Sequence, residues 1–222
     1  MKKTLSIITS LFLLTGLAKA NEIGIGVAGA MHFFDGTGTE TTRQSSQKNT
    51  GSHSHDVLVP ELFVEAISDT GLAIGVSYIP TREMGSKSRS DSNSDGDTGT
   101  YTAKAELKNV AQLYADIPLA SLPVLSVSYP VHLKLGIQHV TLATLESLNS
   151  GSTYPDADLM GLTVGLGTRG DLPMVGGNAY YKVEATYTEF ESYSNDSASS
   201  TGNKLEADFD DTAVKFSIGY KF

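Results

Sequence analysis

The sequence predicts an all-β fold, an eight-stranded antiparallel up-and-down transmembrane β-barrel. Three observations predict it: an export leader, eight segments in which apolar and polar residues alternate, and connections that are short and long in turn. The alternating segments lie at about 22–33, 56–68, 72–82, 103–117, 127–143, 159–170, 178–190 and 212–222.

The first 20 residues have the three parts of a signal peptide. Lys2 and Lys3 make a basic start, residues 5–17 form an apolar stretch, and Ala18 and Ala20 form a small-x-small cleavage site. We therefore divide the chain into a signal peptide, 1–20, and one barrel domain, 21–222. The apolar stretch is short for a membrane anchor, and no later run reaches the roughly 18 apolar residues that a helical span needs.

The composition excludes several classes of function. The chain has no cysteine, which excludes disulfide scaffolds, thiolate metal sites and a cysteine nucleophile. Its formal net charge is −9, so it repels the phosphate backbone of nucleic acids, and we find no local basic patch. We expect no nucleic-acid partner.

The last segment shows the alternation most clearly. One face carries Val214, Phe216, Ile218, Tyr220 and Phe222, and the other carries Ala213, Lys215, Ser217, Gly219 and Lys221. A soluble sandwich also alternates, but its polar face meets water and does not need small residues. Here the polar faces are rich in Gly and Ala, which favours a narrow lumen inside and lipid outside.

The connections alternate in length as an up-and-down barrel requires. Short ones lie at 69–71, 119–126 and 171–177, and long, polar ones lie at about 34–55, 83–102, 144–158 and 191–211. Outer-membrane barrels have short periplasmic turns and long external loops, so both termini are predicted to be periplasmic. Pro60 and Pro130 fall within predicted strands, where each should mark a bulge or a strand end because proline has no N–H to donate.

Charged residues on the polar faces are predicted to lie in the lumen. The inward-facing set is Glu61, Glu65, Lys104, Glu106, Lys108, Asp116, Lys134, Arg169, Lys182, Glu184 and Lys215. Bases and acids are nearly balanced in this set, and charges in a narrow space must pair or stay wet. We expect an ion-pair network that fills the lumen; a narrow ion path is the alternative.

Catalytic and metal-binding patterns are weak. His32 and His132 are predicted to face the lumen, but Ser128 lies about 13 Å from His132 along its strand, beyond hydrogen-bond reach. Residues 91–96 match the opening of an EF-hand loop without the Glu at its twelfth position. Residues 53–56, His-Ser-His-Asp, could hold zinc or copper. We interpret both motifs as solvated polar loops and expect no catalytic residues, no metal and no cofactor.

The carboxy-terminal strand carries a resemblance to a known group of proteins. It ends in Phe222, with aromatic or aliphatic residues at every second position before it. With the leader and the eight segments, it resembles the small eight-stranded outer-membrane β-barrel superfamily of Gram-negative bacteria, with its OmpA-like, OmpX-like and opacity-type members. One departure is the absence of Trp, so the aromatic girdles would consist of Phe33, Tyr78, Tyr129, Tyr181, Tyr187 and Tyr220.

The resemblance implies a location and partners. It implies an outer-membrane monomer that contacts lipid and lipopolysaccharide. It also implies that Phe216, Ile218, Tyr220 and Phe222 form the signal read by the barrel assembly machinery. The alternative is that these four residues only face lipid, and both can hold together.

Two classes of function stay open. The first is a structural or surface-interaction barrel, acting in envelope integrity, adhesion or recognition, whose loops meet lipopolysaccharide, host factors, other cells or phage. The second is a small passive, porin-like channel for ions or small solutes. Because the expected loops at 83–102, 144–158 and 191–211 are acidic, divalent cations could bridge them weakly to the phosphates of lipopolysaccharide.

Overall fold

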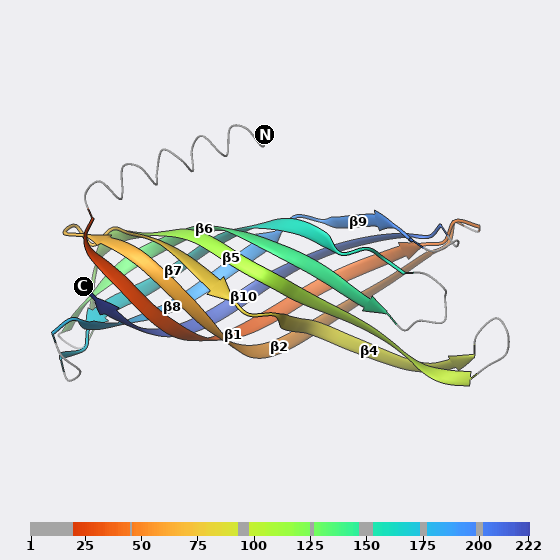
Figure 1. The fold of residues 1–222 in the computed structure, drawn as a ribbon, viewed down its shortest axis with the longest axis horizontal. Helices are drawn as coiled ribbons and strands as arrows, with labels where there is room; N and C mark the ends of the chain where they lie inside the picture. Colours follow the sequence, from red (N-terminus) through yellow and green to blue (C-terminus); the bar gives the residue numbers. More distant parts are fainter. Residues whose placement is uncertain are drawn as a thin grey trace, which may run out of the picture.

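The computed structural model describes residues 20–44, 46–92, 98–124, 127–146, 153–173, 177–198 and 202–222. These residues form ten strands, shown in Figure 1: β1 (Ala20–Thr41), β2 (Lys48–Ser68), β3 (Ala73–Ile79), β4 (Arg82–Ser92), β5 (Thr98–Val124), β6 (Val127–Glu146), β7 (Ala157–Asp171), β8 (Ala179–Phe190), β9 (Tyr193–Asp196) and β10 (Lys204–Lys221). Within this part of the chain, no helix is long and apolar enough to cross a membrane.

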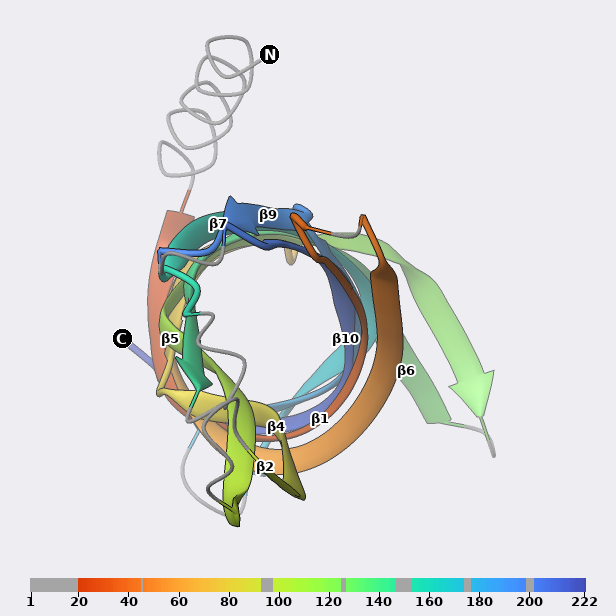
Figure 2. The ribbon, with the colours of Figure 1, turned by 90° about the vertical axis from the view of Figure 1, so that its right-hand side faces the viewer.

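The strands close into a ring (Figure 2). All pairings are antiparallel, and the order β1-β2-β3-β5-β6-β7-β8-β10 returns to β1 through a β1–β10 ladder. β4 follows β3 along β5, and β9 pairs with β10 beyond the end of β8, so the ten strands make an eight-stranded barrel. The predicted fold class is therefore confirmed. We call the end where β1 starts and β10 finishes the termini end, and the opposite end the loop end.

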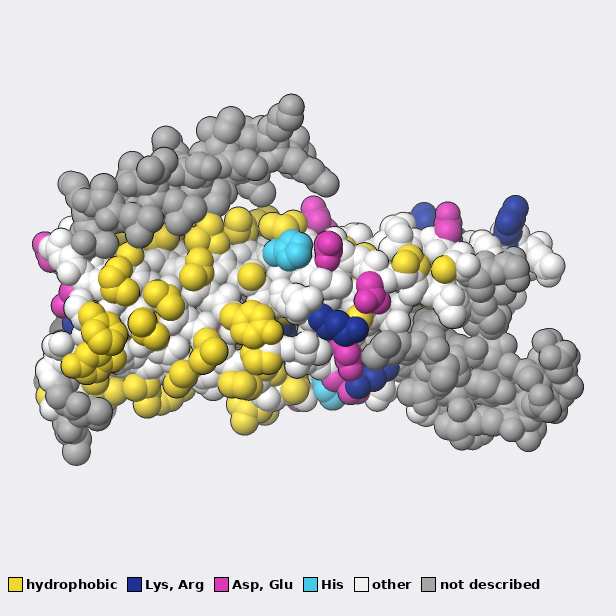
Figure 3. Space-filling model, viewed as in Figure 1, with side chains coloured by type: hydrophobic (Ala, Val, Ile, Leu, Met, Phe, Trp, Pro, Cys, Tyr) yellow, Lys and Arg dark blue, Asp and Glu magenta, His cyan; other side chains and the backbone are white. Residues whose placement is uncertain are grey.

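Apolar side chains cover the outside of the barrel over the half nearer the termini end (Figure 3). In β10, Phe216 is 53% exposed and Ile218 46%, whereas Lys215 and Ser217 between them are 3% and 2% exposed. The same alternation holds in β1, β6 and β7, as predicted. A broad apolar outer surface of this kind is the lipid-facing belt of a membrane barrel.

Small residues on the inward face make room for aromatic rings. A Cβ at Gly24 or Gly219 would overlap the ring of Tyr180, and one at Gly75 would overlap the ring of Tyr114. Both tyrosines are buried in the lumen. The glycine-rich polar faces thus reflect the filling of a narrow barrel by large side chains.

The strands extend well past the predicted segments at the loop end. β1 and β2 remain paired as far as Thr41 and Lys48, and β4 and β5 as far as Ser92 and Thr98. The prediction of solvated loops at 34–55, 83–102 and 191–211 is thus wrong for most of the described residues there. The prediction of a turn at 119–126 is also wrong, since β5 reaches Val124. Polar stretches rich in Ser, Thr and Gly can continue a ladder without an apolar face, so the alternation ends before the strands do.

A β-bulge in β5 changes which side chains face the lumen on the loop side of the bulge. The β5–β6 register shifts between Lys108 and Ala111, and Asn109 has a positive φ of 53°. On the loop side of this bulge, Leu107 faces inward and is fully buried. The predicted lumen positions of Lys104, Glu106 and Lys108 are therefore wrong: one extra residue moves this run of side chains to the opposite face.

Pro60 and Pro130 each lie where a strand loses one neighbour. β2 pairs with β3 only up to Leu62, two residues before Pro60 is reached, while Pro60 itself still pairs with Gly29 of β1. β6 pairs with β7 from Val131 onward, and Pro130 pairs only with β5. Neither proline lies at a bulge or at a strand end, so the prediction from the missing N–H is wrong as stated; each lies instead where its strand loses pairing on one side.

Candidate functional site: a charged plug and an apolar chamber

The lumen is divided along its axis into two regions of opposite character. Towards the termini end it is filled by a network that we call the charged plug: Glu61, Glu65, Asp116, His132, Lys134, Arg169, Lys182, Glu184 and Lys215. Towards the loop end the buried side chains are apolar.

Asp116 of β5 is at the centre of the charged plug. Its carboxylate is 2.7 Å from Lys134 Nζ, 3.2 Å from Lys182 Nζ and 3.2 Å from Arg169 Nη2. These bases come from β6, β8 and β7, so the contacts cross the lumen. The carboxylate is fully buried, and three cations compensate the cost of taking it out of water.

Glu65 of β2 is held in the same layer. Lys182 Nζ lies 2.8 Å and Arg169 Nη2 3.0 Å from its two oxygens. The hydroxyls of Tyr114 and Tyr180 donate to it at 2.7 and 2.8 Å. Four strands, β2, β5, β7 and β8, therefore meet at one buried carboxylate, which leaves little space for a water-filled path.

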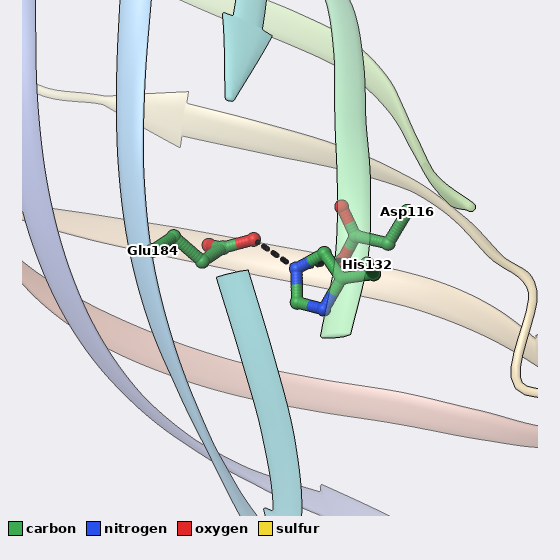
Figure 4. A group of neighbouring side chains, drawn as sticks. All are labelled: Asp116, His132 and Glu184. Carbon is green, nitrogen blue, oxygen red and sulfur yellow. Dashed lines mark hydrogen bonds and ion pairs between the residues drawn. The ribbon is translucent and has the colours of Figure 1, made fainter. Parts of the chain in front are cut away.

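Asp116, His132 and Glu184 form the group in Figure 4. Among the described residues, this is the group of His and acidic side chains whose atoms lie close enough to hold a metal ion. His132 Nε2 is 3.1 Å from Glu184, but Lys134 Nζ lies between the two acids, 2.7 Å from Asp116 and 3.0 Å from Glu184. The ammonium takes the position that a cation would need, so the group belongs to the ion-pair network.

A separate ion pair, between Lys215 and Glu61, extends the charged plug towards the loop end. Lys215 Nζ of β10 lies 2.7 Å from Glu61 of β2, and both side chains are buried. Above it a neutral layer follows, in which the amides of Gln112 and Gln138 donate to Thr163. Polar contacts thus cross the lumen over most of the length of the apolar belt.

The structure brings eight of the predicted lumen residues into the charged plug: Glu61, Glu65, Asp116, Lys134, Arg169, Lys182, Glu184 and Lys215. Lys104 instead pairs with Glu83 of β4 and with Glu106, away from the charged plug, and its hydrogen bond lowers the pKa of the Glu83 carboxyl. Lys108 is not part of the charged plug either. His132 was predicted to face the lumen without a partner. Tyr114, whose hydroxyl completes the Glu65 site, was not among the predicted site residues.

The loop half of the lumen contains an apolar cavity of about 300 Å³, which we call the apolar chamber. Its apolar lining comes from β1, β4, β5, β6, β9 and β10: Phe34, Met84, Ala105, Leu142, Tyr193, Leu205, Ala207 and Phe209. Beneath it, Ile79, Leu107, Val110 and Val140 are fully buried. Polar residues complete the lining, among them His53, Lys87, Lys104 and Asp208. The apolar part of the walls suits an apolar molecule.

One side of the apolar chamber lacks a hydrogen-bonded wall. β2 pairs with β3 only between Leu62 and Ile67, and in the described residues β4 pairs with β5 alone. The chamber is lined by residues of both facing edges, 51–53 on β2 and 84–87 on β4. There the His53 ring lies against Gly85, which has a positive φ of 149°. The barrel wall is therefore weakest between β2 and β4.

The remaining predicted motifs do not form sites in the structure. The rings of His53 and His55 are 6.5 Å apart on one face of β2, and the intervening Ser54 side chain bonds to Asp35. Residues 93–97 of the EF-hand-like stretch lie outside the described residues, as does the side chain of Ser128. The last strand closes the ring: the Phe222 N–H donates to the Ile23 carbonyl at 2.9 Å, and the Phe222 ring contacts Tyr220.

The closed ladder, the apolar outer belt and the ion-paired lumen define a transmembrane β-barrel of the small outer-membrane type. The structure is similar to that of the outer membrane protein OprG from Pseudomonas aeruginosa, with a TM-score of 0.57 and 16% identity over 92% of this chain and 97% of that one. This likeness shows a shared fold.

Two further solved structures are similar at lower scores. They are the outer membrane protease OmpT from Escherichia coli (TM-score 0.42, 12% identity, 91% of this chain and 97% of that one) and Ail, the attachment invasion locus protein of Yersinia pestis (TM-score 0.31, 10% identity, 89% and 99%). No protein-family model and no curated protein matches the sequence.

Proposed function

We propose that this chain is an outer-membrane protein that takes small apolar molecules into the apolar chamber from outside the cell and releases them sideways into the membrane. The change along the lumen, from apolar walls to a fully ion-paired network, carries the proposal. A molecule that enters at the loop end meets the charged plug and has no path along the axis. In this proposal the loop end faces outward and both termini face the periplasm, as in barrels with short turns at one end.

The driving force is the transfer of apolar surface out of water. Each Å² of apolar surface removed from water stabilises binding by roughly 25 cal/mol. The outer surface of a Gram-negative cell is a charged, hydrated layer, which an apolar molecule crosses poorly. An apolar cavity at the loop end would give such a molecule a favourable intermediate position.

The exit route follows from the unpaired edges of β2 and β4. Opening the wall there breaks no ladder between the two strands, since the described residues have none. Elsewhere in the loop half, opening would separate long ladders such as β1–β2 and β5–β6. The edge between β2 and β4 is therefore the side at which the chamber opens at least cost.

Binding of a neutral fluorescent probe, N-phenylnaphthylamine, to the barrel in lipid nanodiscs tests the proposal. We expect saturable binding that Ala207→Phe weakens at least tenfold, because the ring fills the chamber. Ala185→Phe adds the same ring on the outer face and serves as the matched control. Binding no greater than to empty nanodiscs would contradict the proposal, as would equal binding by both variants.

A cross-link tests the side exit. Since the chain has no native cysteine, Ser52→Cys and Ser86→Cys can be joined selectively by a short bismaleimide across the edges of β2 and β4. We expect the joined barrel to bind the probe but to release it slowly into the surrounding lipid. Unchanged release would contradict the side exit while leaving chamber binding intact.

The passive channel is the competing proposal, and conductance separates the two. A lumen crossed by direct ion pairs should carry almost no current in a planar bilayer, whereas an ion path should give steady conductance. Sustained single-channel steps from the purified protein would favour the channel.

A surface-interaction role is a second candidate, favoured by the strands that project beyond the apolar belt. The β1–β2 and β4–β5 hairpins extend past it at the loop end (Figures 1 and 3). Replacing residues 42–47 with a short turn and assaying adhesion, complement survival and phage sensitivity tests this role. Wild-type behaviour in all three assays would argue against it.

We also propose that Phe216, Ile218, Tyr220 and Phe222 act in assembly by the barrel machinery. All four are exposed on the outer face of the closing strand. Deleting Phe222 should lower the outer-membrane yield while leaving export intact, because the leader is a separate signal. Normal surface levels in the deletion strain would defeat this role.

A further inference from the structure

A buried guanidinium lies just below the apolar chamber. Arg82 starts β4, two residues before Met84, which lines the chamber. Its guanidinium carbon is 5.2 Å from the centroid of the Phe34 ring, and the His32 ring stacks on the same ring at 5.8 Å. Phe34 itself lines the chamber. Arg82 and His32 are therefore separated from the chamber by one side chain.

The hydrogen-bonding capacity of Arg82 is unused. Its side chain is about 1% exposed, and Nε, Nη1 and Nη2 have no hydrogen-bond partner among the described residues. The nearest carboxylate is Asp211, whose Oδ2 lies 3.5 Å from Nη2, but that oxygen is engaged by His32 Nδ1 at 2.7 Å. A buried guanidinium with three unbonded nitrogens is costly unless something else satisfies it.

The plug does not supply the missing acceptor. The carboxylate of Glu61, the acid of the charged plug on β2 nearest the loop end, is held by Lys215 at 2.7 Å. Arg82 thus differs from the bases of the plug, which lie 2.7 to 3.2 Å from one or more carboxylates. Its donors remain available at the boundary between the polar and apolar regions.

We propose that Arg82 binds the carboxylate of a small apolar acid whose hydrocarbon tail lies in the apolar chamber. A guanidinium offers parallel N–H donors that match the two oxygens of a carboxylate, and charge-assisted bonds of this kind are about twice as strong as neutral ones. The head group would pass beside Phe34, while the tail keeps contact with Leu142 and Phe209. The inference deepens the proposed function, on which it rests for the position of the tail.

An acid is favoured over an alcohol or an alkane by the chemistry of this boundary. Arg82 can only donate, so it needs an acceptor, and an alkane offers none. A hydroxyl accepts from one or two donors without adding a charge, whereas a carboxylate accepts from several and balances the guanidinium. Asp211 is the nearest acid, but its Oδ2 lies 3.5 Å from Arg82 and is shared with His32, so the three nitrogens of Arg82 can still donate to a carboxylate.

Paired ligands with equal tails test the inference. Decanoate and decanol are used to displace N-phenylnaphthylamine from the barrel in nanodiscs, with wild type, Arg82→Gln, Arg82→Lys and a surface control, Lys204→Gln. We expect wild type and the control to prefer decanoate by about tenfold, a ratio that corresponds to about 1.4 kcal/mol. Arg82→Gln should lose that preference while decanol still binds, and Arg82→Lys should restore part of it.

A direct spectroscopic reading separates the inference from the proposed function. The ¹³C carboxylate resonance of labelled decanoate should shift on binding to wild type and to Lys204→Gln, and not with Arg82→Gln. If the neutral probe fails to bind any variant and this resonance does not move, the proposed function fails. If the probe binds but decanoate and decanol compete equally in wild type and Arg82→Gln, only the role of Arg82 is overturned. Heat-modifiable gel mobility of each variant confirms that it is folded before it is compared.

Discussion

The two halves of the lumen lie within one eight-stranded barrel but are filled by opposite means. In the termini half, the interior consists of charged groups held by direct contacts between facing strands, such as Asp116 with Lys134 and Glu65 with Lys182. In the loop half, it consists of apolar side chains around a cavity. The difference shows that a narrow barrel can have a lumen blocked by ion pairs at one end and a cavity at the other without any change in the number of strands.

The two fillings respond differently to a lost group. Removing one partner of a buried ion pair leaves an uncompensated charge, which costs several kcal/mol. Removing an apolar group leaves a void whose cost depends on how far the neighbours relax. We therefore expect the same small truncation to weaken the charged plug more than the wall of the apolar chamber.

The largest effect is expected for Asp116→Asn. The substitution keeps the shape of the side chain but removes the charge that Lys134, Lys182 and Arg169 share. We expect the free energy of unfolding to fall by about 3–5 kcal/mol, measured by denaturant titration of the barrel refolded into lipid vesicles. Asp69→Asn, the same substitution at an exposed turn after β2, controls for the change of charge. Equal stability of Asp116→Asn and wild type would mean that the plug is wet.

Lys215→Leu should have a smaller effect, of about 3 kcal/mol. It leaves Glu61 without its cation, but it breaks one ion pair, whereas Asp116→Asn affects three. The same titration measures it, with Ser217→Leu as a companion that tests crowding two residues along β10. A neutral result for both variants would show that these side chains do not face the lumen.

Leu107→Ala sharpens the comparison from the apolar side. Leu107 is fully buried in the apolar cluster below the chamber. We expect a loss of about 2 kcal/mol, at the low end for such a truncation, because the adjoining cavity lets neighbours rearrange. The probe affinity of this variant should change less than that of Ala207→Phe. A loss as large as that of Asp116→Asn would remove the contrast between the two halves.

The sequence predicted the termini half far better than the loop half. Lys134, Lys182 and Lys215 were placed correctly because strict alternation persists across the apolar belt, where lipid demands an apolar face at every second residue. Beyond the apolar belt the strands do not contact lipid, so no apolar face is required. The bulge at Asn109 turns the side chains of Lys104 and Glu106 to the opposite face of the strand. Asn109 has a positive φ in the structure, but an asparagine in the sequence does not by itself mark a bulge.

The candidate head-group site could not be predicted for a related reason. Arg82 and Asp211 are 129 positions apart and both fell at the edges of stretches that were expected to be loops. Their meeting depends on strands that continue beyond the alternating segments and on the closure of β10 against β1. Asp211 does share the alternation of Lys215 and Ala213, so extending the predicted strand by one residue would have found it.

The smallest effect on stability is expected for Asp210→Asn, just outside the apolar belt, at a residue that belongs neither to the charged plug nor to the apolar chamber. Asp210 of β10 lies opposite Asp35 of β1 and Glu189 of β8. Asp35 is two residues beyond Phe33 on the same face of β1. Partial burial and the nearby Asp35, Asp211 and Glu189 raise the pKa of the Asp210 carboxyl. Since the folded state holds this proton more tightly than the unfolded chain, the stabilisation by protonation is complete at low pH and is lost as pH rises from the ordinary Asp range through the raised pKa. Asp210→Asn removes the repulsion, so we expect it to be slightly more stable than wild type at pH 7 and no more stable at pH 3, by vesicle unfolding titrations at both values. A variant that is less stable than wild type at pH 7 would mean that a cation or a lipid head group already compensates these carboxylates.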